Sequence, residues 1–149
     1  MKIKSFLSMF TTLFVVLLFI ACAGTEPSAP EGVETEIWRL ELTDQTRGTL
    51  EMTLWRQENQ PGVHVTGGKI SGKIEDHLGG AGQISITFKG SITDGVFKAS
   101  LSGKSKLTEG PSPVTGTIQG NLSDSKGSGT YRTKHKLGTS KGGYTMIKE

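Results

Sequence analysis

The sequence of 149 residues has one cysteine, Cys22, and no stretch with the hydrophobic periodicity of an amphipathic helix. A single thiol cannot form a disulfide within the chain, and it excludes zinc sites built from several cysteines. The missing helical periodicity excludes helical bundles and the alternating strand–helix order of α/β enzymes. What remains is one small domain built from strands.

The sequence also lacks a convincing catalytic or metal-binding motif. Residues 138–142 fit the pattern G-x-S-x-G, but a nucleophile elbow requires a strand, a tight turn and then a helix, so we expect a flexible turn around Ser140. His64, His77 and His135 have no metal-ligand spacing, and Glu75-Asp76-His77 is expected to be a solvated polar turn. We therefore predict no enzyme, no catalytic residue, no metal and no cofactor.

Residues 1–21 follow the plan of a secretory leader. Lys2 and Lys4 form a basic start, residues 6–20 are almost wholly apolar, and Ala21 is a small residue directly before Cys22. The apolar segment is shorter than the ~20 residues that a membrane-spanning helix requires. These residues predict a cleaved signal peptide.

The segment Leu17-Leu18-Phe19-Ile20-Ala21-Cys22 resembles the lipobox of bacterial lipoproteins, although Phe19 stands where that family usually has leucine. The resemblance implies that Cys22 becomes the lipidated first residue of the mature chain. The membrane would then be a partner through Cys22, and the protein would lie in the cell envelope. In Gram-negative members of the family, Ala23 in place of aspartate favours the outer membrane, facing the periplasm.

Charge is distributed unevenly along the chain. Residues 23–60 contain eight acidic and three basic residues, whereas residues 61–149 contain six acidic and twelve basic residues. Lys2 and Lys4 leave with the leader, so the mature chain is nearly neutral overall. This asymmetry argues against a uniform nucleic-acid-binding face, and we predict no nucleic-acid partner.

Three regions follow the leader. Residues 22–34, rich in glycine, proline, serine and acids, predict a flexible tether that starts at the lipidated cysteine. Residues 35–149 show apolar alternation typical of strands. Three interruptions are predicted: a β-bulge or sharp bend at Gly67-Gly68, a loop over 75–82, and a glycine-rich break over 138–143.

The strand pattern predicts an all-β fold, an antiparallel up-and-down meander of about eight strands. Thr93-Asp94-Gly95 is expected to be a tight turn, with Phe88 and Phe97 buried on the strands that flank it. Closing the sheet into a barrel would remove its exposed edges. In this respect the mature chain resembles the calycin or lipocalin-like barrels of small bacterial lipoproteins.

Two hypotheses for function remain open at this point. The first is a non-enzymatic, lipid-anchored barrel that binds a small apolar ligand or an envelope component. The second is a structural or inhibitory interaction protein that has a filled core and engages a protein partner through its loops. A cavity of roughly 300 Å³ or more would favour the first hypothesis. A core filled by Trp38, Phe88, Phe97 and Tyr131 would favour the second.

Two exposed features are candidates for contacts. Arg132, Lys134 and Lys136 alternate along one predicted strand, so they are expected to point outward together and could meet an anionic envelope surface. Basic residues on strands also serve to keep sheets from pairing edge to edge, which is the simpler explanation. Trp55 lies on the face opposite Leu54 and is expected at a barrel mouth or on the outer wall.

Overall fold

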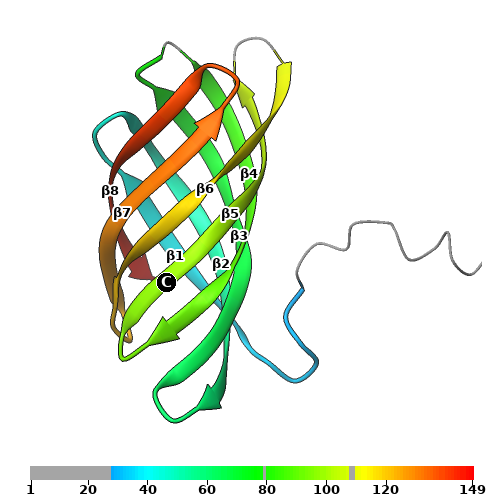
Figure 1. The fold of residues 1–149 in the computed structure, drawn as a ribbon, viewed down its shortest axis with the longest axis vertical. Coiled ribbons are helices and arrows are strands. Elements are labelled where there is room, and N and C mark those ends of the chain that lie inside the picture. Colours follow the sequence, from blue (N-terminus) through cyan, green and yellow to red (C-terminus); the bar gives the residue numbers. More distant parts are fainter. Residues whose placement is uncertain (1–27, 79, 108–109) are drawn as a thin grey trace, which may run out of the picture.

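The computed structural model describes residues 28–78, 80–107 and 110–149. The predicted leader and Cys22 lie outside the described residues. Eight antiparallel strands follow one another around the sheet in chain order (Figure 1). The strands are β1 (Thr35–Leu42), β2 (Thr46–Gln60), β3 (Val63–Asp76), β4 (Ala81–Thr93), β5 (Val96–Leu107), β6 (Gly110–Leu122), β7 (Lys126–His135) and β8 (Gly138–Lys148).

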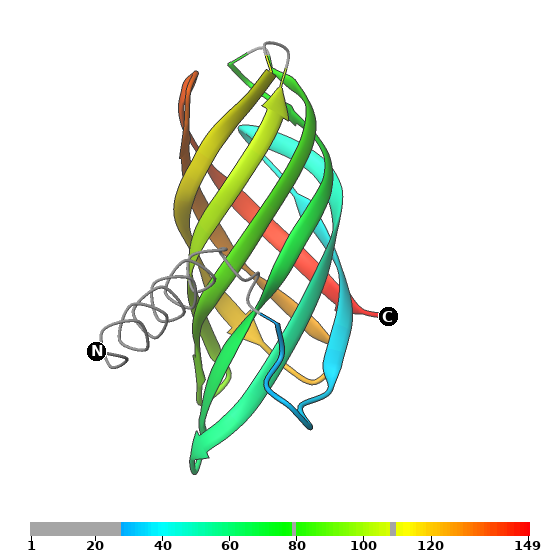
Figure 2. The ribbon, with the colours of Figure 1, turned by 90° about the vertical axis from the view of Figure 1, so that its right-hand side faces the viewer.

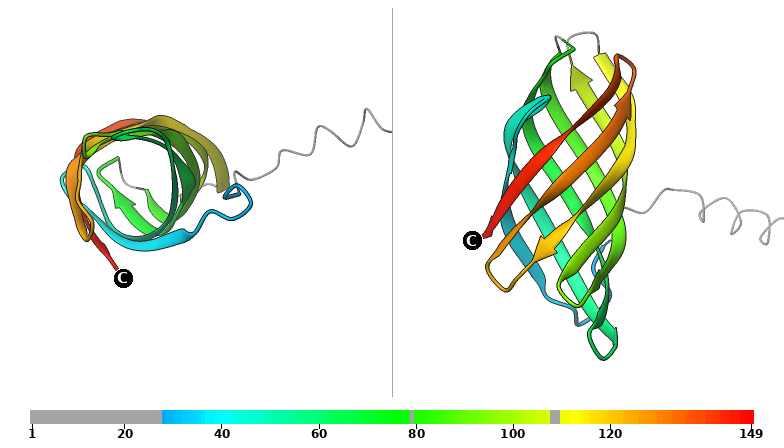
Figure 3. Two further views of the ribbon diagram at one scale, coloured as in Figure 1. Left: turned by 90° about the horizontal axis from the view of Figure 1, so that it is seen from below. Right: turned by 60° about the vertical axis from the view of Figure 1, so that its left-hand side comes forward.

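The first and last strands close the sheet into a barrel. Residues Trp38 to Leu42 of β1 pair with Tyr144 to Lys148 of β8, so the predicted all-β meander and its closure are confirmed. Seen along its axis, the sheet forms a continuous ring (Figure 3). The described residues contain no helix that could cross a membrane.

The barrel has two ends, named here by their position in Figure 1. The upper end carries the β1–β2, β3–β4, β5–β6 and β7–β8 connections, and the lower end carries the other three. The segment before β1 contains a turn in which Val33 N–H donates to Pro30 O, and it runs along the outside near the lower end (Figure 2).

The apolar residues that alternate along each strand point inward and fill the interior. Trp38, Phe88 and Phe97 are almost completely buried, and the rings of Phe88 and Phe97 meet edge to face at 5.8 Å. The predicted turn beside them is also present. Asp94 and Gly95 both have positive φ, which gives the two-residue turn that suits the twist of a hairpin.

Close approach between strands depends on inward-facing glycines. Gly120 of β6 pairs with Gly129 of β7, and a Cβ atom added to Gly120 would lie 2.1 Å from Ser128 O. No side chain fits there without moving the neighbouring strand. Glycine at these inward positions therefore lets neighbouring strands approach closely.

The structure corrects four sequence-based expectations. β3 pairs with β4 without a shift across Gly67 and Gly68, so the predicted bulge or bend is wrong there. A register shift occurs instead between Glu58 and Gln60 of β2. The alternation of Val63 and Val65 with His64 in the sequence predicts that Val65 is buried, but it points outward. Thr66 is buried instead, and its hydroxyl donates to Trp55 O at 2.6 Å.

The other two corrections concern the upper end. β3 continues to Asp76 and β4 begins at Ala81, so the loop predicted over 75–82 is shorter. The glycine-rich residues 138–143 are not a break, because they form the first half of β8 and pair with β7. Every described strand and the whole described core lie within 35–149.

We expect Phe88→Ala and Phe97→Ala each to lower the free energy of unfolding by about 3–5 kcal/mol, because each leaves a cavity in a packed core. Thermal or denaturant unfolding of the single variants measures this. Val65→Ala, on the outer wall, is the control and should change stability by less than about 0.5 kcal/mol. Unchanged midpoints for both phenylalanine variants would contradict the packing.

Candidate functional site

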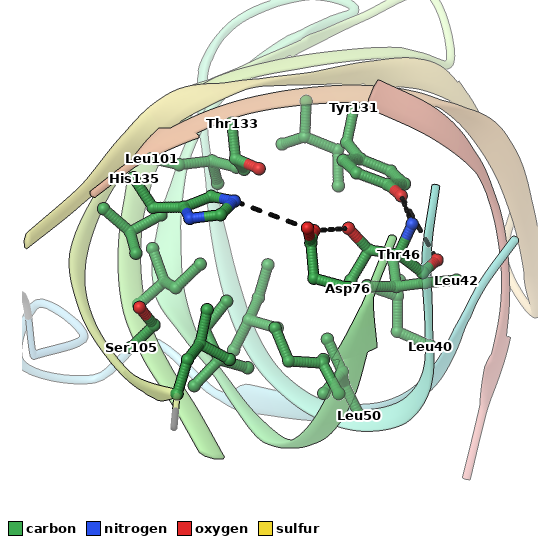
Figure 4. A pocket seen from close by; sticks show the side chains of 17 residues that line it. Leu40, Leu42, Thr46, Leu50, Asp76, Leu101, Ser105, Tyr131, Thr133 and His135 are labelled. Atoms are coloured by element: carbon green, nitrogen blue, oxygen red, sulfur yellow. Dashed lines mark hydrogen bonds and ion pairs between the residues drawn. The ribbon is translucent and has the colours of Figure 1, made fainter. Parts of the chain in front are cut away.

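A small cavity lies in the upper half of the barrel interior. Its volume is about 40 Å³, with room for about two or three water molecules, and its wall is mainly apolar. Polar side chains of β2, β3, β5 and β7 point into it (Figure 4). The site is therefore a buried polar cluster beneath the upper end of the barrel.

The centre of this cluster is the carboxylate of Asp76, at the end of β3. Ser140 Oγ donates to Asp76 Oδ2 at 2.5 Å, and Thr46 Oγ1 donates to the same oxygen at 2.8 Å. The backbone N–H of Leu78 donates to Asp76 Oδ1 at 3.0 Å. Three segments that are distant in the sequence thus meet at one carboxylate, and the expectation that Asp76 is solvated is wrong.

The surroundings of Asp76 also set its acidity. Burial raises the pKa of this carboxyl, but hydrogen bonds from Ser140, Leu78 and Thr46, together with the nearby His135, lower it more strongly. The net pKa lies below the ordinary value of 3.8. Asp76 is therefore charged inside the barrel end at neutral pH, where its hydrogen-bond donors stabilise it.

The Ser140, His135 and Asp76 side chains meet, but not as a catalytic triad. His135 Nε2 lies 3.2 Å from Ser140 Oγ and 3.7 Å from Asp76 Oδ2, so one ring nitrogen faces both partners. In a triad the two ring nitrogens bridge the hydroxyl and the carboxylate. Here Ser140 is fully buried and donates directly to Asp76, which makes it a structural donor rather than a nucleophile.

His135 keeps one unsatisfied atom. Its side chain is 5% exposed, and its buried Nδ1 has no hydrogen-bond partner among the described residues. His77, in the β3–β4 turn, places Nδ1 at 3.4 Å from Asp76 Oδ1. Within the described part of the chain, no three His, Cys, Asp or Glu side chains gather in a group that could hold a metal ion.

Tyr131 fixes the β1–β2 turn to the same end of the barrel. Its hydroxyl accepts a hydrogen bond from Thr46 N–H at 3.0 Å and lies 3.2 Å from the carbonyl oxygen of Thr46. The β1–β2 turn and the start of β2 are therefore tied to β7. This contact explains why Tyr131 is buried although its hydroxyl requires partners.

The lower end of the barrel carries a network of charged side chains instead. Glu36 accepts hydrogen bonds from Arg56 Nη2 at 2.7 Å, from Lys148 Nζ at 3.0 Å and from Trp38 Nε1 at 3.0 Å. Burial raises the pKa of Glu36, and its donors Arg56, Lys148 and Trp38 lower it to below 4.5 overall. This network joins β1, β2 and β8 at the lower end of the barrel, next to the buried Trp38.

The three predicted basic residues are exposed as expected, whereas Trp55 is half-buried. Arg132 and Lys134 lie on the outward face of β7, while Lys136 is exposed just past the end of that strand, in the β7–β8 turn. Trp55 lies on the outer wall rather than at a mouth. It borders a groove of about 260 Å³, and its ring covers Gly67, where an added Cβ atom would lie 2.7 Å from the indole.

Sequence reasoning missed the Asp76 cluster. Asp76, Ser140 and Thr46 are far apart in the chain, and each stands in a segment that resembles a turn. The sequence did contain a local signal. When the strands are extended to their observed ends, all three residues fall at positions that face the barrel interior. The network at Glu36 was missed for the same reason.

We expect Asp76→Asn to lower the free energy of unfolding at neutral pH by about 1.5–3 kcal/mol, because hydrogen bonds to a charged acceptor are lost. Since the folded pKa is depressed, the contribution of Asp76 is complete above the unfolded value and declines as pH falls through the folded pKa. The difference between the two proteins should therefore shrink below about pH 4. Urea unfolding across that pH range measures it.

Glu75→Gln changes the exposed neighbour of Asp76 and serves as the control for this measurement. It should leave stability nearly unchanged at every pH. A difference between Asp76→Asn and the unmodified protein that stays constant down to the lowest pH would contradict a charged, hydrogen-bonded Asp76.

Comparison with known protein families, with curated proteins and with solved structures finds no match for this chain.

Proposed function

We propose that the protein is a lipid-anchored barrel of the cell envelope that has a filled core and acts through its outer surface and loops. It is not proposed to be an enzyme. The anchor is Cys22, and the tether over 22–34 separates it from the barrel. By the lipoprotein resemblance, its place is the outer membrane facing the periplasm in a Gram-negative cell.

The observation that carries the filled-core proposal is the volume of the interior. The cavity of about 40 Å³ is much smaller than the roughly 300 Å³ that a small-molecule site requires. Trp38, Phe88 and Phe97 occupy the interior where a lipocalin-like carrier would hold its ligand. This supports the interaction protein over the carrier of a small apolar ligand.

Both mouths of the barrel support the same proposal. A ligand entering from above would have to break the hydrogen bonds of Asp76 with Ser140 and Thr46. From below it would have to break the ion pairs of Glu36 with Arg56 and Lys148. A barrel whose interior is filled leaves its outer wall and turns as the surfaces available to a partner.

The lipid anchor is tested by Cys22→Ser. We expect the unmodified protein, made in a bacterium, to enter the detergent phase of a detergent–water separation, because a lipidated cysteine is its durable membrane attachment. The variant should appear in the aqueous phase or remain uncleaved. An unmodified protein that stays in the aqueous phase would rule out the lipoprotein.

The filled core is tested with a small apolar fluorophore such as N-phenyl-1-naphthylamine, added to the lipid-free chain that begins at residue 23. We expect no saturable one-to-one binding. Leu50→Ala enlarges the cavity that Leu50 lines and is the positive control, because engineered apolar cavities can admit small apolar molecules. Stoichiometric binding by the unmodified chain would support the carrier instead.

A further inference from the structure

Two parts of the barrel's outer wall differ in the charges of their side chains. Strands β4 to β8 contain no acidic residue, whereas the outward positions of β1 to β3 mix Glu41, Glu51 and Glu75 with basic residues. Among the acids that follow β3 in the sequence, Asp94 and Asp124 stand in the β4–β5 and β6–β7 connections, and Glu149 follows β8. Glu109 lies outside the described residues.

Within this acid-free wall, exposed bases flank one strand on both sides. We call them the basic face: Lys98, Lys104 and Lys106 on β5, with Arg132 and Lys134 on β7. All five are exposed and at outward parity. Lys89 on β4 and Lys141 on β8 extend the positive charge beyond the two strands.

The strand between them, β6, has no charge. The pairing places Pro113 beside Lys104, Thr115 beside Lys134, and Thr117 beside Arg132. Neighbouring strands lie about 4.8 Å apart, so the two rows of bases are about 10 Å apart with short, uncharged side chains between them. The long basic side chains of both β5 and β7 can therefore reach a flat surface that lies against β6.

We infer that the basic face binds the anionic head groups of a lipid bilayer, so that the barrel lies on its side against the membrane. The charges spread over a broad convex wall, which fits a planar array of phosphates. Strands β4 to β8 present no aromatic side chain outward for stacking nucleic-acid bases, since Phe88, Phe97, Tyr131 and Tyr144 are all buried inside.

This inference rests on the proposed envelope location, which would keep the face within reach of a bilayer. The tether leaves the lower end of the barrel next to the outer wall, and its length permits the barrel to lie down. Binding by the face would orient a barrel that the lipid already holds. The basic face extends the predicted contact at Arg132 and Lys134 from one strand to two, with the uncharged strand β6 at its centre.

The test uses the lipid-free chain from residue 23, which keeps all eight strands and the described core. Cosedimentation is measured with vesicles of phosphatidylglycerol and phosphatidylcholine, and with phosphatidylcholine alone. We expect binding to the anionic vesicles only, weakening as added salt shortens the Debye length toward about 3 Å at 1 M. Each charge near an anionic surface is worth about a fivefold change in binding.

The combined variant Lys104→Gln, Arg132→Gln, Lys134→Gln should therefore bind about 100-fold more weakly. The matched control is Arg39→Gln, Arg47→Gln, Lys73→Gln, which removes the same net charge from exposed positions on β1 to β3. We expect the control to lose a few-fold at most. Unchanged circular dichroism and thermal midpoints verify that both variants fold.

Equal losses in the two triple variants would overturn the inference, because net charge alone would then explain binding. No binding of the unmodified chain to anionic vesicles would overturn it as well, and so would tighter binding to double-stranded DNA than to the vesicles. Detergent separation of the lipidated protein remains a separate measurement. The face variant should still enter the detergent phase, so failure of the face and failure of the anchor give different results.

Discussion

Closure of the sheet between β1 and β8 is the constraint on which the rest of the structure depends. Once Trp38 to Leu42 pair with Tyr144 to Lys148, the ring has no open edge, and alternate residues of every strand must point into one enclosed space. Eight strands leave an interior that side chains just fill. The aromatic core and the glycines facing neighbouring strands are two consequences of fitting that space.

A closed barrel still has two open ends, and each is covered in a different way. At the upper end the Asp76 carboxylate accepts hydrogen bonds from β2, β8 and the β3–β4 turn. At the lower end Glu36 binds two basic side chains above Trp38. Both carboxyls have lowered pKa values because donors surround them, so both mouths are held by charged acceptors at neutral pH.

A filled interior moves the question of function to the outside. The wall from β4 to β8 carries bases without acids, and the wall from β1 to β3 carries both. The strands of both walls need apolar residues at their inward positions, so packing of the core does not require the difference in outward charge. It is the outward half of each strand, free of packing constraints, that can carry a surface function.

The sequence by itself determined the fold class, the strand number and the facing of Phe88 and Phe97, because a period of two residues is a local property that hydrophobic side chains reveal. It could not place Asp76, Ser140 and Thr46 together, since polar residues at strand ends look like turns until the pairing partners are known. Val65 shows the opposite error: its apolar side chain predicts burial, but an apolar residue can also lie on an outer wall. Only the tertiary structure decided that the barrel is filled, how its ends are closed, and that the bases of β5 and β7 flank the same strand. Each of these depends on contacts between residues that the chain holds far apart.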